Sequence, residues 1–226
     1  MSTKTLSATG VGSTFAGSAR REQLIDCAID ALSELGYPQT SIAEVARRAG
    51  VSKGVVTYHF PARDDLIWAV TSRVFDSITA SVGSRIEAVA PARFIETYLT
   101  AWVDFYRDSW REMSAIAEIW VNFRDPRGQR HLGARTLGHE RRLVESALAA
   151  GQADGSLRAF SPTVMAVTLK AALDGLLAQL ALEPALDLDA YRDELLTLFE
   201  SATSRPRRTM KSVAPRSAAR KKEEKQ

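Results

Sequence analysis

The chain has 226 residues, of which 45% are hydrophobic and 25% charged, and its formal net charge is +3. This length allows one or two domains with a sizeable core. The single cysteine, Cys27, excludes an internal disulfide, and no apolar run approaches the roughly 18 residues of a membrane-spanning helix. The N-terminus lacks the basic start and continuous apolar centre of a signal peptide, so we expect a cytoplasmic protein without a membrane partner.

The net charge is unevenly distributed along the chain. Residues 205–226 hold nine Lys or Arg and two Glu, a net charge of +7, so the preceding residues carry −4. This tail is predicted to be disordered, and it acts either as a basic arm on DNA or as a solubilising extension. Residues 19–65 carry −1, so DNA binding there must depend on where individual cations lie.

The composition favours an all-α fold. Ala, Leu, Arg and Glu dominate, and the alternating β-branched residues that mark strands are scarce. Residues 1–17 are rich in Gly, Ser, Thr and Ala without a period, and they are predicted to be disordered. A first helix is predicted from about Ser18 to Leu35, and Gly36 ends it.

The stretch SIAEVARRAGVSKGVVTYHF, residues 41–60, has the pattern of a helix-turn-helix. Its first half places apolar residues at helical spacing. Ser41 can cap that helix, and Glu44 completes a capping box, so two free backbone donors should be satisfied. Gly50 then provides a left-handed turn, and Ser52 can cap the second helix.

The second helix of this pair carries groups suited to reading DNA. Small and cationic residues in its first turn let the backbone approach a phosphate, and methyl, hydroxyl, phenol and imidazole groups follow. The alternative is that two short helices merely pack within an all-α domain. The predicted DNA contacts are Ser41, Ser52, Lys53, Gly54, Val55, Thr57, Tyr58, His59 and Arg63.

The sequence resembles the TetR family of transcriptional regulators in the segments RREQLIDCAIDALSELGY, SIAEVARRAGVSKGVVTYHF and PARDDLIWAV. The resemblance implies a three-helix DNA-binding domain at residues 18–65 and a larger helical domain at residues 66–204 that binds an effector and dimerises. It also supports a phosphate contact by Arg63. Val55 and Thr57 depart from the residues that this family often has there, so its base preference is not carried over.

Helical periods and breakers divide the larger domain into further helices, with a turn at RDPRG, residues 124–128. One helix closes between Gly151 and Gly155, and Ser161 with Pro162 starts the next. The other helices are predicted at about residues 63–90, 91–107, 110–123 and 189–202.

The helices at 91–107 and 110–123 carry more aromatic side chains than two neighbouring helices usually need. Large rigid groups are difficult to pack closely, so an apolar cavity or an ordinary solid core could result. The TetR resemblance favours a cavity for a small hydrophobic or aromatic effector. Its predicted lining is Phe94, Tyr98, Trp102, Phe105, Met113, Ile116, Trp120 and Phe123.

The helix that starts at Pro162 is apolar nearly all round, apart from a charged edge at Lys170 and Asp174. Such a helix should be covered on two sides, by its own domain and by a partner subunit. With the last helix it predicts a four-helix interface of a homodimer, although burial within a monomer is the alternative. The predicted interface residues are Thr168, Ala171, Ala172, Gly175, Tyr191, Leu195, Leu198 and Ala202.

An acidic box for a cationic ligand is a minor possibility, since Asp104, Glu118 and Asp174 lie among aromatic residues. Helical geometry places the first two away from the aromatic faces. The sequence contains no glycine-rich phosphate loop, nucleophile elbow or Cys/His metal cluster, so no enzyme, cofactor or metal site is predicted.

The sequence therefore predicts a homodimeric repressor that leaves a palindromic double-stranded operator when a small effector binds. Two other classes stay open. A DNA-tethering protein with a protein partner would have a closed helical domain without a cavity. An enzyme built on the helical domain would have a convergent set of titratable groups in its cavity.

Overall fold

The computed structural model describes residues 9–124 and 134–205, and the regular elements in these ranges are all helical. The predicted all-α class is therefore confirmed. The predicted tail beyond residue 205 and most of the predicted RDPRG turn lie outside the described residues. The elements in chain order are α1 (Thr9–Leu35), α2 (Ile42–Ala49), α3 (Lys53–His59), α4 (Arg63–Ile78), η1 (Thr79–Gly83), α5 (Ser84–Ile86), η2 (Pro91–Arg93), α6 (Phe94–Asp108), α7 (Trp110–Asn122), α8 (Ala134–Asp154), α9 (Pro162–Leu182) and α10 (Leu188–Thr203).

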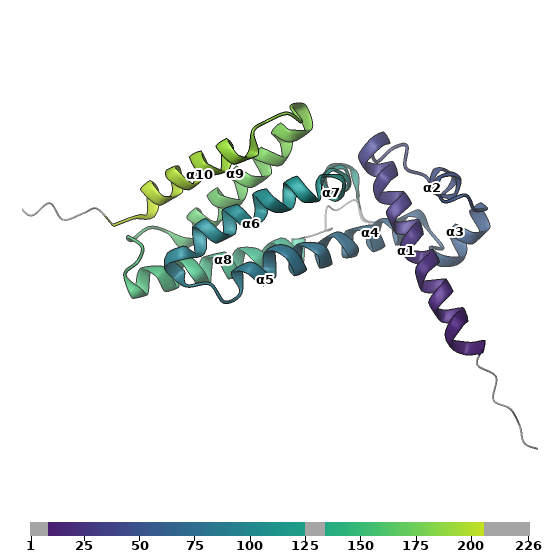
Figure 1. The fold of residues 1–226 in the computed structure, drawn as a ribbon, viewed down its shortest axis with the longest axis horizontal. Helices are drawn as coiled ribbons and strands as arrows, with labels where there is room; N and C mark the ends of the chain where they lie inside the picture. Colours follow the sequence, from purple (N-terminus) through teal and green to yellow (C-terminus); the bar gives the residue numbers. More distant parts are fainter. Residues whose placement is uncertain (1–8, 125–133, 206–226) are drawn as a thin grey trace, which may run out of the picture.

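The helices α1, α2 and α3 form one end of the molecule, and α4 leads from them into an elongated helical bundle (Figure 1). Within the bundle α6 packs against α9 and α10, and α8 packs against α9. At the junction α1 packs against α2, α4 and α7. One continuous apolar core runs through both parts, from Leu24 to Phe199.

The first helix is longer than predicted. It begins at Thr9 and not near Ser18, so residues 9–17 are helical and not disordered, while residues 1–8 lie outside the described part. Gly, Ser and Thr are weak helix formers, which is why the sequence suggested disorder. However, no proline interrupts this stretch, and adding a turn to an existing helix avoids the cost of a new nucleus.

The helix predicted at residues 63–90 is interrupted by a π-helical turn. The α-helical hydrogen bonding of α4 stops at Ile78, five residues form the π turn η1, and a short α5 ends at Ile86. The sequence shows no breaker such as proline here, so periodicity alone could not reveal the change. π turns of this kind are often found at functional sites.

The remaining predicted helices are confirmed, with ends shifted by at most three residues, because Pro91–Arg93 form the 3-10 turn η2 ahead of α6. Gly36 and Gly155 have φ values of 79° and 85°, so both adopt the left-handed conformation expected after a helix. Ser161 Oγ accepts a hydrogen bond from Val164 N–H at 3.3 Å, with Pro162 in the first turn of α9.

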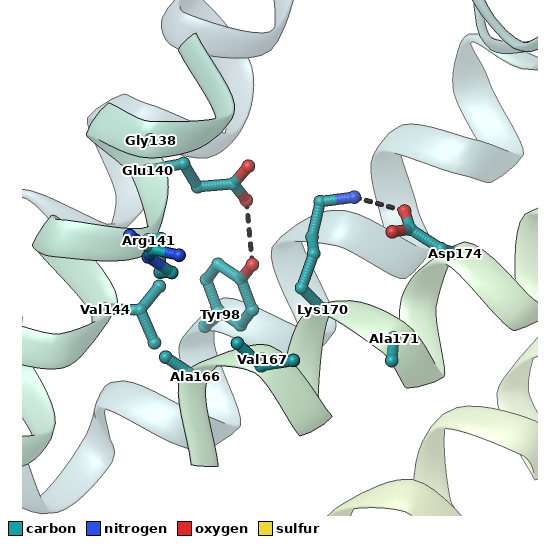
Figure 2. Close-up of a pocket in the computed structure, with 10 residues that line it drawn as sticks. All are labelled: Tyr98, Gly138, Glu140, Arg141, Val144, Ala166, Val167, Lys170, Ala171 and Asp174. Atoms are coloured by element: carbon teal, nitrogen blue, oxygen red, sulfur yellow. Dashed lines mark hydrogen bonds and ion pairs between the residues drawn. The ribbon is translucent and has the colours of Figure 1, made fainter. Parts of the chain in front are cut away.

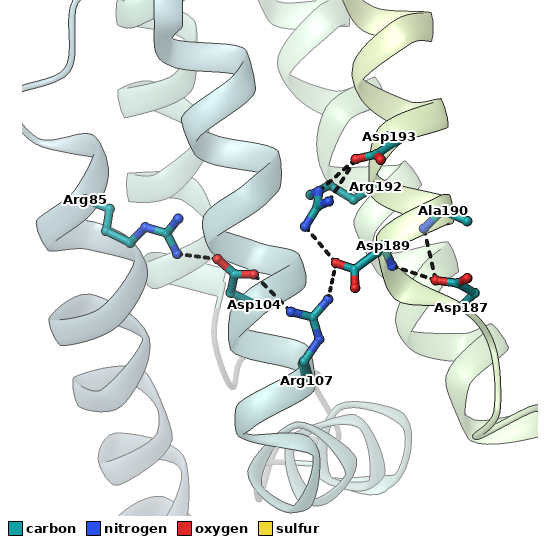
Figure 3. A network of polar contacts seen from close by, with 8 residues as sticks. All are labelled: Arg85, Asp104, Arg107, Asp187, Asp189, Ala190, Arg192 and Asp193. Atoms are coloured by element: carbon teal, nitrogen blue, oxygen red, sulfur yellow. Dashed lines mark hydrogen bonds and ion pairs between the residues drawn. The ribbon is translucent and has the colours of Figure 1, made fainter.

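A network of ion pairs ties α10 to α6 and to α5 (Figure 3). Asp104 lies at its centre, where it pairs with Arg85 at 2.8 Å and with Arg107 at 3.5 Å. Arg107 also pairs with Asp189 at 2.6 Å, and Arg192 pairs with the same carboxylate at 2.8 Å. Asp104 is therefore structural, as its place on the polar side of the helix predicts.

Helix α9 has a high mean hydropathy although polar residues interrupt its apolar run. This 21-residue helix has a mean hydropathy of 1.5 over its most apolar window, so it is long and apolar enough to span a membrane by length and composition. No uninterrupted apolar run approaches 18 residues, as expected, and the average hydropathy of the window is what passes the limit. The difference arises because Lys170 and Asp174 interrupt the apolar run without lowering its average below the limit.

Candidate DNA-binding surface and ligand cavity

The turn between α2 and α3 has the predicted geometry. Ser41 Oγ accepts a hydrogen bond from Glu44 N–H at 3.2 Å, and Ser52 Oγ accepts one from Val55 N–H at 3.4 Å. Gly50 has a φ of 64°, in the left-handed region that glycine tolerates best. These contacts fix the angle between the two helices and confirm the helix-turn-helix.

The predicted capping box is only half formed. The Glu44 carboxylate bonds Arg47 at 2.7 and 2.8 Å and Arg48 at 2.7 Å, and does not return to Ser41 N–H. Two adjacent guanidinium groups attract a carboxylate more strongly than one amide does. Their hydrogen bonds lower the pKa of Glu44 to about 2. Arg48 also pairs with Glu34 at 2.9 Å, so both arginines are engaged within the protein.

The outer face of α3 forms a continuous exposed surface. Val56 and Phe60 anchor the helix, being 0% and 1% exposed, while Tyr58 is 84% exposed. Lys53 takes part in no ion pair within the described residues, so its ammonium is available to a phosphate. Of the predicted contacts on α3 and its cap, the exposed ones are Ser52, Lys53, Gly54, Thr57 and Tyr58, and the half-buried ones are Val55 and His59.

Arg63 has a structural role that the sequence did not reveal. Its Nε donates to the Thr40 carbonyl at 2.7 Å, and Nη2 donates to the Tyr37 carbonyl. The guanidinium also lies over the Tyr37 ring, 4.0 Å from its centroid. The Arg63 guanidinium is therefore engaged by the loop between α1 and α2. The predicted phosphate contact of Arg63 stays a prediction.

The DNA-binding end is joined to the bundle by polar contacts across α7. Glu118 Oε2 accepts a hydrogen bond from Tyr37 N–H at 2.8 Å, and Arg111 pairs with Asp30 at 2.8 Å. The Glu118 carboxylate is thus bound to the loop between α1 and α2, and the same residue borders a pocket with Trp110, Trp120 and Asp174.

Two cavities lie beside Lys170 in the bundle. A cavity of about 500 Å³ between α6, α8 and α9 is lined by Tyr98, Gly138, Glu140, Arg141, Val144, Ala166, Val167, Lys170, Ala171 and Asp174. A smaller one of about 140 Å³ is lined by Phe75, Ile78, Thr79, Val82, Gly83, Ile86, Trp102, Trp120, His139, Glu140, Leu143 and Lys170. Glu140 and Lys170 border both, and the π turn η1 forms one wall of the smaller cavity.

The cavities use only part of the predicted aromatic lining. Tyr98, Trp102 and Trp120 line them. The other predicted residues are in the packed core, at 3% exposure or less, because α6 and α7 are covered on several sides: Phe94, Phe105, Met113, Ile116 and Phe123. These five residues line neither cavity, and their place in an effector pocket stays a prediction.

The polar groups of the larger cavity form two pairs (Figure 2). Tyr98 O–H donates to Glu140 Oε1 at 2.7 Å, and the Lys170 ammonium bonds the Asp174 carboxylate one helical turn away. Burial, with the nearby Glu140 charge, raises the pKa of Tyr98 far above its usual range, so its hydroxyl stays protonated. Burial also raises the pKa of Glu140, against the opposing effects of Lys170 and the Tyr98 hydrogen bond.

Comparison with known proteins identifies the DNA-binding end. A profile of the family "Bacterial regulatory proteins, tetR family" matches residues 24–70, which cover the C-terminal part of α1, all of α2 and α3, and the first half of α4. Residues 24–70 thus belong to a TetR-family DNA-binding domain. The HTH-type transcriptional regulator BetI of Escherichia coli O17:K52:H18 is 34% identical over 106 residues, which are 47% of this chain and 54% of that protein. The chain thus matches about half the length of such curated TetR-family relatives.

Solved structures share the fold over the larger domain as well. AibR, solved in complex with isovaleryl coenzyme A and operator DNA, superposes with a TM-score of 0.69 at 17% identity, covering 79% of this chain and 97% of that one. A structure titled as the molecular basis for control of antibiotic production by bacterial hormones gives a TM-score of 0.66 at 26% identity, covering 83% and 98%. The TetR fold therefore includes the bundle that holds the cavities.

The outer side of α9 carries an exposed stripe of apolar and small residues. Their spacing alternates between three and four positions, as in a helix that packs against another helix. The members of this stripe, called the α9 stripe below, are Val164, Thr168, Ala171, Gly175, Ala178 and Leu182. At Gly175 a β-carbon would meet no atom within 4 Å, so the backbone itself is open to a close neighbour.

The predicted dimer residues divide between this surface and the monomer core. Thr168, Ala171, Gly175 and Leu198 are exposed, whereas Ala172, Tyr191 and Ala202 are half-buried. Leu195 is only 7% exposed, because α10 turns it inward with Phe199 to pack against α6. Leu195 therefore belongs to the subunit's own core, and its assignment to the interface is corrected.

Sequence reasoning missed several cavity residues, above all Glu140 and those of α4 and η1. One signal was present: Lys170 and Asp174 are charges within an otherwise apolar helix, and charges there need polar surroundings. They were interpreted as an outer edge of α9 and not as part of a cavity wall. Glu140 gave no such signal, because it lies among the charges of HERR.

Proposed function

We propose that this protein is a homodimeric transcriptional regulator that binds double-stranded operator DNA through α3. The observation that carries the proposal is the outer face of α3, where Lys53 and Tyr58 project from a helix anchored by Val56 and Phe60. An exposed second helix of this motif fits the major groove. The family membership of residues 24–70 supports this assignment.

We further propose that it is a repressor whose effector occupies the cavities beside Lys170. The larger cavity, at about 500 Å³, is within the size range of small-molecule sites. The structurally similar AibR was solved with both a coenzyme A ester and operator DNA, so one protein of this fold binds both kinds of ligand. Release requires the effector to bind the free protein more tightly than the DNA-bound protein.

The alternatives have less support. A protein-partner role would be favoured by a closed domain, and the described bundle contains cavities. An enzyme would be favoured by titratable groups in a cavity, and several are present. However, Lys170 and Asp174 pair with each other, and the Thr79 hydroxyl donates to the Phe75 carbonyl within its own helix. The described lining therefore supplies no activated nucleophile.

Selection of binding sites from random DNA duplexes tests this proposal directly. A dimer with two copies of α3 related by a two-fold axis should enrich a roughly palindromic sequence with half-sites one or more helical turns apart. A Tyr58→Ala variant, whose side chain is exposed and packs little, should fold normally and lose that enrichment. If the wild type enriched no palindrome, the proposal would be wrong.

A further inference from the structure

Not every charged residue that lines the two cavities has an ion-pair partner. Lys170 is paired with Asp174, and Arg141 pairs outward with Glu145, Nε to Oε1 at 3.4 Å. Glu140 borders both cavities, and among the described side chains no cation lies within ion-pair distance of its carboxylate. Among the described side chains, Glu140 is therefore the carboxylate of this lining that lacks an ion-pair partner.

Glu140 is held in place by a neutral donor. Its Oε1 accepts the Tyr98 hydroxyl hydrogen at 2.7 Å, which fixes the carboxylate at the cavity wall (Figure 2). The carboxylate is partly buried, and burial of a charge without a counter-ion is costly. A cation supplied by a ligand would reduce that cost, so the site favours a positively charged guest.

Aromatic faces beside this carboxylate already hold a positive charge. The Lys170 ammonium lies 5.4 Å from the ring centroid of Trp102 and 5.7 Å from that of Trp120. These distances are typical of cation–π attraction. Since Asp174 holds this ammonium at its own end of the cavity, the space in front of Glu140 and Tyr98 is left to another cation (Figure 2).

We propose that the larger cavity binds a small monocationic amine with an apolar or aromatic body. Its ammonium group would lie against Glu140 and the Tyr98 ring, and its apolar body beside Val144, Ala166 and Val167. The inference refines the proposed effector site, on which it rests. A carboxylate ligand would instead need Lys170 or Arg141, which already pair with Asp174 and Glu145.

Three probes of nearly equal size separate these ligand charges: phenethylamine, 2-phenylethanol and phenylacetate, which at pH 7 are a cation, a neutral molecule and an anion. Binding to the purified full-length protein is measured by calorimetry and by thermal shift, without DNA. We expect phenethylamine to bind at least tenfold more tightly than the other two. If phenethylamine did not bind, or if phenylacetate bound more tightly, the proposal would be overturned.

Three variants localise the charge that binds the probe. Glu140→Gln keeps an acceptor for the Tyr98 hydroxyl but removes the charge, so phenethylamine affinity should fall at least tenfold. Lys170→Met removes a competing cation and should leave that affinity unchanged or raise it. Glu200→Gln, the same change at an exposed position on α10 that lines neither cavity, is the matched control and should have no effect. Loss of amine binding in Lys170→Met, or its survival in Glu140→Gln, would overturn the assignment.

A fourth variant keeps the test decisive if Glu140→Gln does not fold. Asp174→Asn alters a half-exposed side chain, at 48% exposure, and frees the Lys170 ammonium to turn toward Glu140. Amine affinity should then decrease, and an unchanged affinity would contradict the proposal.

A DNA-release assay on the selected operator separates the claim that the cavity binds an amine from the claim that this amine is the effector. Amine binding that depends on Glu140 but releases no DNA would leave this site established and the effector role wrong.

Discussion

The carboxylate of Glu118 on α7 accepts a hydrogen bond from the backbone N–H of Tyr37 at 2.8 Å, which links the bundle to the loop ahead of the helix-turn-helix. Arg63 on α4 binds the carbonyl of the same Tyr37. Gly36 permits the approach, since a β-carbon there would lie 3.2 Å from Glu118 Oε2 and its φ is 79°. One residue is thus held by two helices of the larger domain.

Removal of the Glu118 carboxylate should weaken this junction. Glu118→Ala leaves Tyr37 N–H without its acceptor, and we expect the free energy of unfolding to fall by about 1–3 kcal/mol. Glu118→Gln keeps an acceptor oxygen and is the control, with a smaller loss. Urea denaturation measures both. Equal losses in the two variants would show that the hydrogen bond itself contributes little.

Arg63→Lys should destabilise the protein although the charge is kept. Lysine cannot reproduce the planar fork that reaches the Thr40 and Tyr37 carbonyls and covers the Tyr37 ring. We expect a loss of about 1.5–3 kcal/mol in urea denaturation. If stability were unchanged and only DNA affinity fell, Arg63 would be a phosphate contact and not a brace for the loop.

Lys53→Ala should weaken binding to every DNA sequence by a similar factor. Loss of one phosphate contact lowers the slope of log affinity against log salt by about 1 and leaves the preferred sequence unchanged. Titrations of the selected operator and of an unrelated duplex at several salt concentrations measure this. Arg93→Ala, which also removes one exposed cation but lies in η2, should change neither slope.

Gly175→Arg should prevent dimer formation while the subunit still folds. The position is exposed in the subunit and has no neighbouring atom within 4 Å of a β-carbon, so the monomer can accommodate the side chain. In a close helix contact the same charge would be buried without a partner, which costs several kcal/mol. Sedimentation should show monomers, whereas Ala153→Arg, at an exposed position on α8, should remain dimeric. A dimeric Gly175→Arg protein would move the interface away from the α9 stripe.

The stability of the helix-turn-helix should depend on pH through Glu44. Its hydrogen bonds to Arg47 and Arg48 lower its pKa from 4.5 to about 2 on folding. Its contribution is therefore complete above about pH 4.5 and is lost as the pH falls through about 2. Glu44→Gln should lower the urea midpoint at pH 7, and its difference from the wild type should disappear toward pH 2. Added salt should reduce the difference at pH 7, because these charges lie at the surface.

Local signals in the sequence were sufficient for most of the fold. Caps such as Ser52 and Ser161 and left-handed glycines such as Gly36 and Gly50 act within a few residues, so their effects are visible in the sequence. The exposed face of α3 could also be predicted, because an amphipathic helix determines which side is buried. The helices and the turn of the helix-turn-helix were therefore predicted correctly, whereas the Glu44 half of its capping box was not.

The parts that could not be predicted depend on contacts between distant segments. Tyr98 meets Glu140 across 42 positions, and Arg63 meets Tyr37 across 26, and nothing local marks either pair. Whether an aromatic residue such as Phe105 faces a cavity or the core depends on the helices that cover it. The π turn η1 likewise follows from packing and not from any breaker.

Helix α9 borders both the larger cavity and the proposed partner surface, and Ala171 belongs to both. Lys170, Ala171 and Asp174 of α9 line the cavity, while Gly175 and Leu182 of the α9 stripe lie exposed on it. A helix is about 10 Å across, so in the proposed dimer the two ligands would be only a few helix widths apart. A displacement of α9 by the first ligand would then reach the second site directly. Such a protein would respond to its effector over a narrow concentration range, with a Hill coefficient above 1.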